Sequence, residues 1–132
     1  SNLLQIPNSD SNSQYLRGCK ALGLKAHPAR FPTRLPEFFI RFLTNPGDLV
    51  VDIFAGSNTT GFVAEQECRY WLAFENDLHY LAASSFRFME EDANEIDLRT
   101  AYEKIMSCTP VQMISDAKQL QLFEKVSKYQ TE

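Results

Sequence analysis

Three groups of residues in this chain have the types and spacing expected of a single ligand pocket. The first is the turn Asp52-Ile53-Phe54-Ala55-Gly56-Ser57-Asn58-Thr59-Thr60, which follows a short apolar run. The second is the upstream segment Lys25-Ala26-His27-Pro28-Ala29-Arg30-Phe31-Pro32, and the third is Glu75. A glycine turn between a buried strand and a helix lets a ligand approach the main chain, and the amides that begin the helix attract anionic groups.

The composition of the turn narrows the kind of ligand. A dinucleotide fold uses the pattern G-x-G-x-x-G to hold a diphosphate, whereas this turn has only Gly56 and Gly61. That difference argues against a nicotinamide-dependent enzyme. The three hydroxyls and one amide between the two glycines suit the carboxylate and ammonium of an amino acid better; they belong to Ser57, Asn58, Thr59 and Thr60. For this motif alone, a purely structural strand-to-helix turn stays the alternative.

Glu75 adds a second part to the expected pocket. It ends a second apolar run after Gly56, at the spacing of about 20 residues where Rossmann-like folds place a carboxylate that binds ribose hydroxyls. The alternative is a solvated acid at the end of a strand. Together, Gly56 and Glu75 predict a pocket for an adenosine-bearing cofactor.

The hydrophobic pattern predicts the elements that position these groups. A helix over residues 13–24 is expected to stop at Gly23, and a second begins at Thr33 and carries an apolar face. The run Leu49-Val50-Val51-Asp52-Ile53-Phe54 is typical of a parallel strand in the middle of a sheet, buried on both faces. A helix over 59–67, a strand over 70–74 and a helix over 78–88 follow, and amphipathic helices are expected over 96–106 and 116–128. Phe38, Phe39, Phe42 and Leu43 form the apolar face, and Phe62 and Val63 are expected to turn inward.

Strand, helix, strand and helix in this order define the α/β class, with a parallel sheet flanked by helices. We expect one incomplete cofactor-binding domain over residues 1–132. Its parts are a joining segment and short helix (1–24), a cofactor-binding core (25–88) and C-terminal helices (89–132).

Composition excludes several classes of protein. The chain is 44% apolar, which is enough for one hydrophobic core, but its net charge of -4 lacks the basic excess of a duplex-binding domain. Cys19, Cys68 and Cys108 are too widely spaced for a zinc site or a disulfide framework, so we expect free thiols, no metal site and a reducing cytoplasm. No apolar run is long enough to span a membrane.

The three groups, in this order, resemble the C-terminal part of amino-directed DNA methyltransferases. The similarity is greatest to the cytosine-amino methyltransferases of bacterial type II restriction-modification systems. It rests on HPARFPTRLPEFFIRFLT from His27, PGDLVVDIFAGSNTT from Pro46, Phe74-Glu75 and YLAASSFRF from Tyr80. It implies a partial Rossmann-like methyltransferase domain in a bacterial or phage-host cytoplasm, with S-adenosylmethionine as cofactor. The cofactor-binding residues that it implies are His27, Arg30, Phe31, Asp52, Phe54, Gly56, Ser57, Asn58, Thr59 and Glu75.

The residue chemistry of the upstream segment agrees with this resemblance. Arg30 carries a fixed fork of donors suited to a carboxylate, and Phe31, held before Pro32, can pack against apolar parts of the cofactor or against a sulfonium. Two alternatives stay open. His27 is equally consistent with a structural histidine at a loop corner, and Arg30 with an ordinary ion-pair residue.

One motif of the resembled family is absent from the sequence. The family transfers its methyl group at a Ser/Asp/Asn-Pro-Pro-aromatic loop, and these 132 residues contain no Pro-Pro pair. We therefore expect no catalytic residue in the chain, no turnover by it alone, and a fragment or one subunit of a split enzyme. Double-stranded DNA would be bound through the other part, and an exposed sheet face would pair with a complementary subunit or with a second copy. The rival hypothesis is a non-catalytic α/β interaction module derived from such an enzyme.

Overall fold

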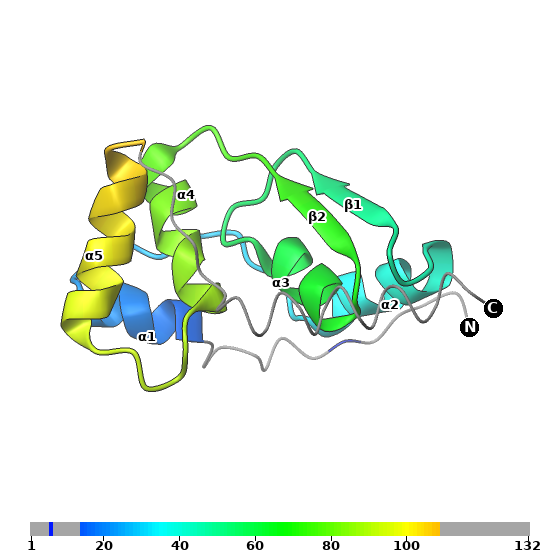
Figure 1. Cartoon of the computed structure of the whole chain (residues 1–132), viewed down its shortest axis with the longest axis horizontal. Helices are drawn as coiled ribbons and strands as arrows, with labels where there is room; N and C mark the ends of the chain where they lie inside the picture. Colours follow the sequence, from blue (N-terminus) through cyan, green and yellow to red (C-terminus); the bar gives the residue numbers. More distant parts are fainter. Residues whose placement is uncertain (1–5, 7–13, 109–132) are drawn as a thin grey trace.

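The structure is a computed structural model that describes Ile6 and residues 14–108. In that part of the chain, two parallel strands alternate with helices along the sequence in the α/β order that the sequence predicts (Figure 1). The elements are α1 (Gln14–Ala21), α2 (Arg34–Leu43), β1 (Leu49–Asp52), α3 (Thr59–Gln66), β2 (Tyr70–Ala73), α4 (Leu78–Ser84), the 3-10 helix η1 (Ser85–Phe88) and α5 (Glu95–Met106). The expected fold class is confirmed.

The two strands and α3 form the β-α-β unit at the centre of the fold. In the register of the parallel pair, Val50 lies opposite Trp71, and both side chains face α3. Val63 and Ala64 of α3 pack there together with Ile40 of α2. Helices α2 and α3 therefore cover the same face of the sheet.

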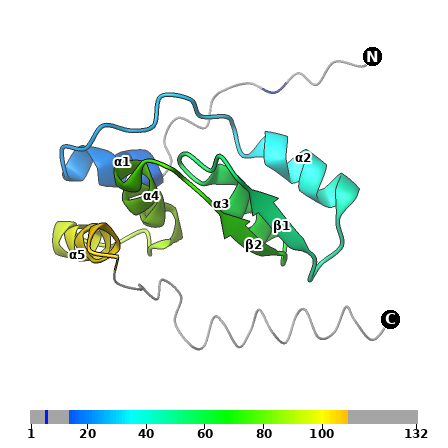
Figure 2. The same ribbon diagram turned by 90° about the horizontal axis from the view of Figure 1, so that it is seen from above.

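A second core lies at the other end of the molecule, where α1, α4 and α5 gather (Figure 2). It is built around the fully buried side chains of Tyr15 and Phe86, with Cys19, Ala83 and Leu98 packed beside them. Because η1 also contacts α3, the two cores are joined through the segment that follows α4.

Most of the predicted elements are confirmed, and the differences are local. Helix α1 stops before Gly23, whose φ of +66° ends the helix as expected. Thr33 occupies the position before α2, but its side chain does not cap that helix. The helix expected over 78–88 ends at Ser84 and tightens into η1, and the helix expected over 96–106 is α5. The helix expected over 116–128 and the irregular segment expected over 2–12, Ile6 excepted, lie outside the described residues.

The prediction that β1 is buried on both faces was wrong. Leu49 and Val51 are 54% and 52% exposed, and Leu72 beside them on β2 is 50% exposed. The apolar run is typical of an interior strand. Among the described residues, however, β1 pairs with β2 alone, and the helices that pack on this sheet lie on one face of it. The apolar face of α2 is similarly exposed, at Phe42 above all. We call the exposed sheet side chains the bare face; they are Leu49, Val51, Tyr70 and Leu72.

None of the helices in the described part of the chain is both long and apolar enough to cross a bilayer.

Candidate cofactor-binding site

The glycine turn and Glu75 meet at the carboxyl ends of the two strands. The Gly56 amide donates to Glu75 Oε2 at 2.8 Å, and the Asp77 amide donates to Glu75 Oε1 at 2.9 Å. An ionised carboxylate has about four acceptor sites. Each oxygen of Glu75 therefore keeps capacity for a further donor, such as a ribose hydroxyl.

His27 lies directly over the glycine of the turn. Gly56 has a φ of +54°, and a Cβ atom placed on it would lie 3.1 Å from His27 Cε1. The His27 amide donates to the Tyr15 hydroxyl at 2.8 Å, and the His27 ring meets the edge of the Tyr80 ring at a centroid distance of 4.6 Å. The structure thus brings the upstream segment, the turn and Glu75 together, although they are separated in the sequence.

The polar side chains of the turn bond to the protein itself. Asn58, with a φ of +54°, is the N-cap residue that precedes α3, and its Oδ1 accepts from the Gly61 amide at 3.0 Å. Ser57 Oγ lies 3.3 Å from Thr59 Oγ1 and accepts from Arg87. All three side chains are buried. Contacts between this turn and a ligand would therefore come mainly from its main chain, which differs from the expectation that the hydroxyls face the ligand.

Asp52 stabilises the turn from the end of β1. Its Oδ2 accepts from Thr60 Oγ1 at 2.6 Å, and its Oδ1 accepts from the Phe54 amide at 3.0 Å. The structure therefore gives Asp52 a role in shaping the turn.

A Thr60→Val variant should lower the free energy of unfolding by about 1 kcal/mol, because it removes one hydrogen bond to a carboxylate while keeping the side-chain shape. Chemical denaturation of the two proteins measures this difference. A Thr100→Val variant, which loses only an exposed bond to the Ile96 carbonyl on α5, is the matched control. Equal loss in both variants would contradict a special contribution from the Asp52 bond.

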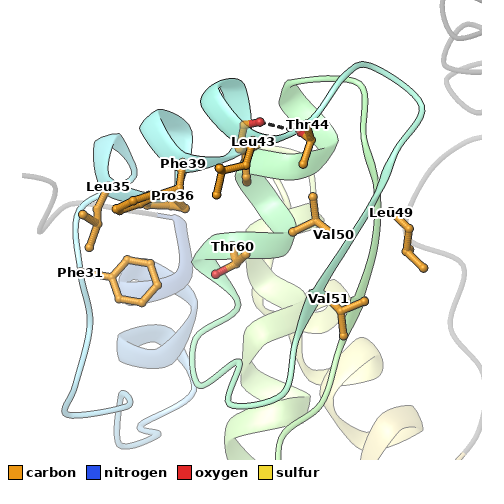
Figure 3. Close-up of a pocket in the computed structure, with 11 residues that line it drawn as sticks. Phe31, Leu35, Pro36, Phe39, Leu43, Thr44, Leu49, Val50, Val51 and Thr60 are labelled. Carbon is orange, nitrogen blue, oxygen red and sulfur yellow. Dashed lines mark hydrogen bonds between the residues drawn. The ribbon is translucent and has the colours of Figure 1, made fainter.

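Three of the expected site residues are exposed. Arg30 donates from Nη1 to the His27 carbonyl at 2.5 Å, so its guanidinium stays beside the histidine. Phe54, 85% exposed, lies in the turn itself. Phe31 lines an apolar groove of about 450 Å³ between α2 and β1, where Figure 3 shows its ring beside Leu35 and Pro36.

Sequence reasoning missed two buried residues that hold the site. Arg87 in η1 donates to the Ser57 carbonyl and hydroxyl at 2.5 and 2.9 Å, and its guanidinium lies 5.2 Å from the centre of the Tyr15 ring. Burial lowers the pKa of Arg87 to about 10 and raises that of Tyr15 to about 12, so both keep their protons at neutral pH. Arg87 lies within the quoted segment YLAASSFRF, as a cation between Phe86 and Phe88 at the end of an apolar stripe, and that position was the signal available in the sequence.

In the described part of the chain, no three His, Cys, Asp or Glu side chains lie close enough together to hold a metal ion.

The fold and the site together define an α/β domain in which the glycine turn, His27 and Glu75 meet at the carboxyl ends of two parallel strands. The protein-family comparison is more specific. The model of the N6- and N4-type DNA methylases matches residues 2–86, and the chain belongs to this DNA methylase family. The resemblance stated from the motifs is confirmed.

Individual relatives support the same assignment. The chain is 60% identical over 106 residues to the type II methyltransferase M.PvuII of Proteus hauseri, covering 80% of this chain and 32% of that protein. It is 41% identical over 76 residues to M.Cfr9I of Citrobacter freundii, covering 58% of this chain and 25% of that protein. A solved PvuII DNA methyltransferase, described as cytosine-N4-specific, matches with a TM-score of 0.77 over 81% of this chain and 38% of its own. The chain thus spans about a third of the length of its PvuII relative.

Proposed function

We propose that this chain is the cofactor-binding portion of a site-specific DNA methyltransferase that modifies the exocyclic amine of cytosine. The observation that carries the proposal is the bond from the Gly56 amide to Glu75, because it joins the two halves of the expected pocket at one edge of the sheet. The 60% identity to a cytosine-N4-specific relative supports cytosine over adenine.

The residues present fit S-adenosylmethionine. Glu75 keeps acceptor capacity for ribose hydroxyls, and the main chain at Gly56, under His27, leaves no room for a side chain. Arg30 holds an exposed positive charge beside His27 that suits the carboxylate of an amino acid. When bound, this cofactor supplies a methyl group activated by a sulfonium. The remaining proposed contacts are Phe31, Asp52, Phe54, Ser57, Asn58 and Thr59, with Asp52 and the three turn side chains acting through the shape of the turn.

In this proposal the chain's own part in the reaction is to bind and orient. Holding the two reactants in a fixed relative position can supply most of the rate enhancement of a direct transfer. The flipped base and its amine would be held by a proline-proline loop, which these 132 residues do not contain. In this proposal the chain depends on the other part of the enzyme for turnover and for binding duplex DNA. Its net charge of -4 supports the second dependence, because duplex binding usually relies on basic residues.

We further propose that the outer edge of β1 receives a β-strand from that other part. The Tyr70 and Phe74 amides donate to the carbonyls of Asp48 and Asp52, so alternate residues of β1 point their main-chain groups at β2. By that alternation, the main-chain groups of Leu49 and Val51 point to the outer edge, where an added strand would pair with them.

The groove beside this edge is lined by side chains whose apolar chemistry suits such a strand. Its walls are apolar side chains of α2 on one side and of β1 on the other, with Thr60 between them (Figure 3). An exposed edge next to a bare apolar face is otherwise a site of aggregation. The PvuII relative has about two thirds of its length outside the matched region, which is ample to supply the strand.

A complementation assay tests the proposed function. The chain alone should transfer no methyl group from labelled S-adenosylmethionine to duplex DNA. Co-expression with the part of M.PvuII outside the matched region should restore transfer at cytosine. Transfer by the isolated chain would refute the requirement for a separate loop, and failure of a soluble, co-purifying pair to transfer would refute the proposed role.

The alternative function is a non-catalytic interaction module, and the bare face is the observation that favours it. Calorimetry with S-adenosylhomocysteine separates the two, since the module needs no cofactor. Sedimentation of the isolated chain shows whether a second copy covers the bare face instead of a partner.

A further inference from the structure

Two buried residues that are not among the expected ligand contacts, Arg87 and Tyr15, connect the glycine turn with the upstream segment. Arg87, only 7% exposed, bonds the carbonyl and hydroxyl of Ser57 in the turn. Tyr15, fully buried, lies under the Arg87 guanidinium and accepts the amide proton of His27 with its hydroxyl. The turn and the upstream segment are thus both held by one pair of side chains.

We propose that Arg87, with Tyr15 as its platform, is a positioning residue that sets the glycine turn and His27 in the geometry needed to bind the amino-acid part of the cofactor. This inference rests on the proposed function. Neither side chain is among the expected ligand contacts, and Arg87 acts through Ser57 while Tyr15 acts through His27.

The chemistry of Arg87 favours such a role over simple core packing. Burying a guanidinium is costly, and apolar replacements of buried charges are often neutral or stabilising. Here the bonds described above are to a carbonyl and a hydroxyl of a single turn residue, not to a carboxylate. A planar fork can hold both acceptors of Ser57 at once, whereas an ammonium is a single flexible point charge.

The position of the pair explains how it would affect one half of the pocket. Helices α1, α4, η1 and α5 build the core around Tyr15 and Phe86, which is a different cluster from the sheet core. Ser57 is next to Gly56, whose amide contacts Glu75, and His27 lies on Gly56. Releasing Ser57 would let the turn move away from His27, while Glu75 would keep its bond to the Asp77 amide.

An Arg87→Lys variant tests the inference, with affinities measured for two ligands. S-adenosylhomocysteine carries the amino-acid group, and 5'-methylthioadenosine lacks it. We expect Arg87→Lys to weaken S-adenosylhomocysteine about tenfold or more and methylthioadenosine by less than about threefold. Tyr15→Phe, which keeps the ring and removes the acceptor of the His27 amide, should shift the ratio of the two affinities in the same direction by a smaller factor.

Arg69→Lys is the matched control. Arg69 is also buried, at 8% exposed, and it bonds the carbonyl and hydroxyl of Thr44 near the opposite end of α3. Its replacement should lower the melting temperature without changing the ratio of affinities. The inference would be contradicted if Arg87→Lys weakened both ligands equally, or if Arg69→Lys changed the ratio of the two affinities as much as Arg87→Lys does. Arg87 would then have a structural role only.

Hydrogen exchange of the unliganded chain separates failure of this inference from failure of the proposed function. Arg87→Lys should speed exchange of the Gly56 amide, and Tyr15→Phe that of the His27 amide, each by about tenfold or more relative to Arg69→Lys. Unchanged exchange overturns the positioning role even if the cofactor binds. If the wild-type chain binds neither ligand but Arg87→Lys still speeds exchange of the Gly56 amide, the positioning role for the turn stands. The cofactor site is then rejected.

Discussion

A Gly56→Ala variant should lose at least about a hundredfold in affinity for S-adenosylhomocysteine. Alanine at a φ of +54° is strained by roughly 1–2 kcal/mol, and the new methyl group would lie 3.1 Å from His27 Cε1. His27 would have to give way by a few tenths of an ångström, and a turn that rotates to relieve the strain would move the Gly56 amide away from Glu75. Calorimetry on the purified variant measures the loss.

Gly23→Ala is the control for strain alone. Gly23 has a comparable φ of +66°, but a Cβ atom there would meet nothing within 4 Å, and the residue lies beyond α1. Both variants should lower stability, since both strain the main chain, but only Gly56→Ala should affect the ligand. Similar affinities for Gly56→Ala and the wild-type chain would show that the turn does not form the pocket.

The frame of the candidate site could be predicted from the sequence because strong local patterns encode it. The β-branched run before the turn predicted β1, and the spacing from Gly56 to Glu75 placed both residues at one edge of the sheet, as their hydrogen bond shows. Gly23 predicted the end of α1 because a glycine at positive φ commonly terminates a helix.

The internal hydrogen bonds of the candidate site were not predictable in the same way. The hydroxyl of Ser57 was assigned to a ligand, yet it bonds Arg87, 30 residues later, because α4 and η1 return the chain to the turn. Nothing local to Ser57 signals that partner. The prediction that β1 is buried on both faces was wrong for a related reason. An apolar run indicates that a strand is suited to burial, but it does not indicate whether the covering segment belongs to the same chain.

A Val51→Pro variant should abolish methyl transfer in the complementation assay while leaving the isolated chain folded. Proline at position 51 has no amide proton, and the Val51 amide points to the outer edge by the alternation along β1. The isolated chain should tolerate the change, because proline is accepted on an edge strand where the amide faces away from the sheet. The partner strand would lose a hydrogen bond and meet a ring in its place. Co-purification and labelled transfer measure the effect, and circular dichroism checks that the variant is folded.

Val50→Pro and Val51→Thr are the paired controls. Val50 directs its main chain at β2, so its replacement should unfold the β1–β2 pair itself, whereas Val51→Thr keeps the amide and should assemble normally. Normal assembly and transfer by Val51→Pro would show that no strand adds at this edge. The exposed apolar face would then have to be covered through its side chains alone, and a charge at Leu72, half exposed on β2, would become the more damaging change.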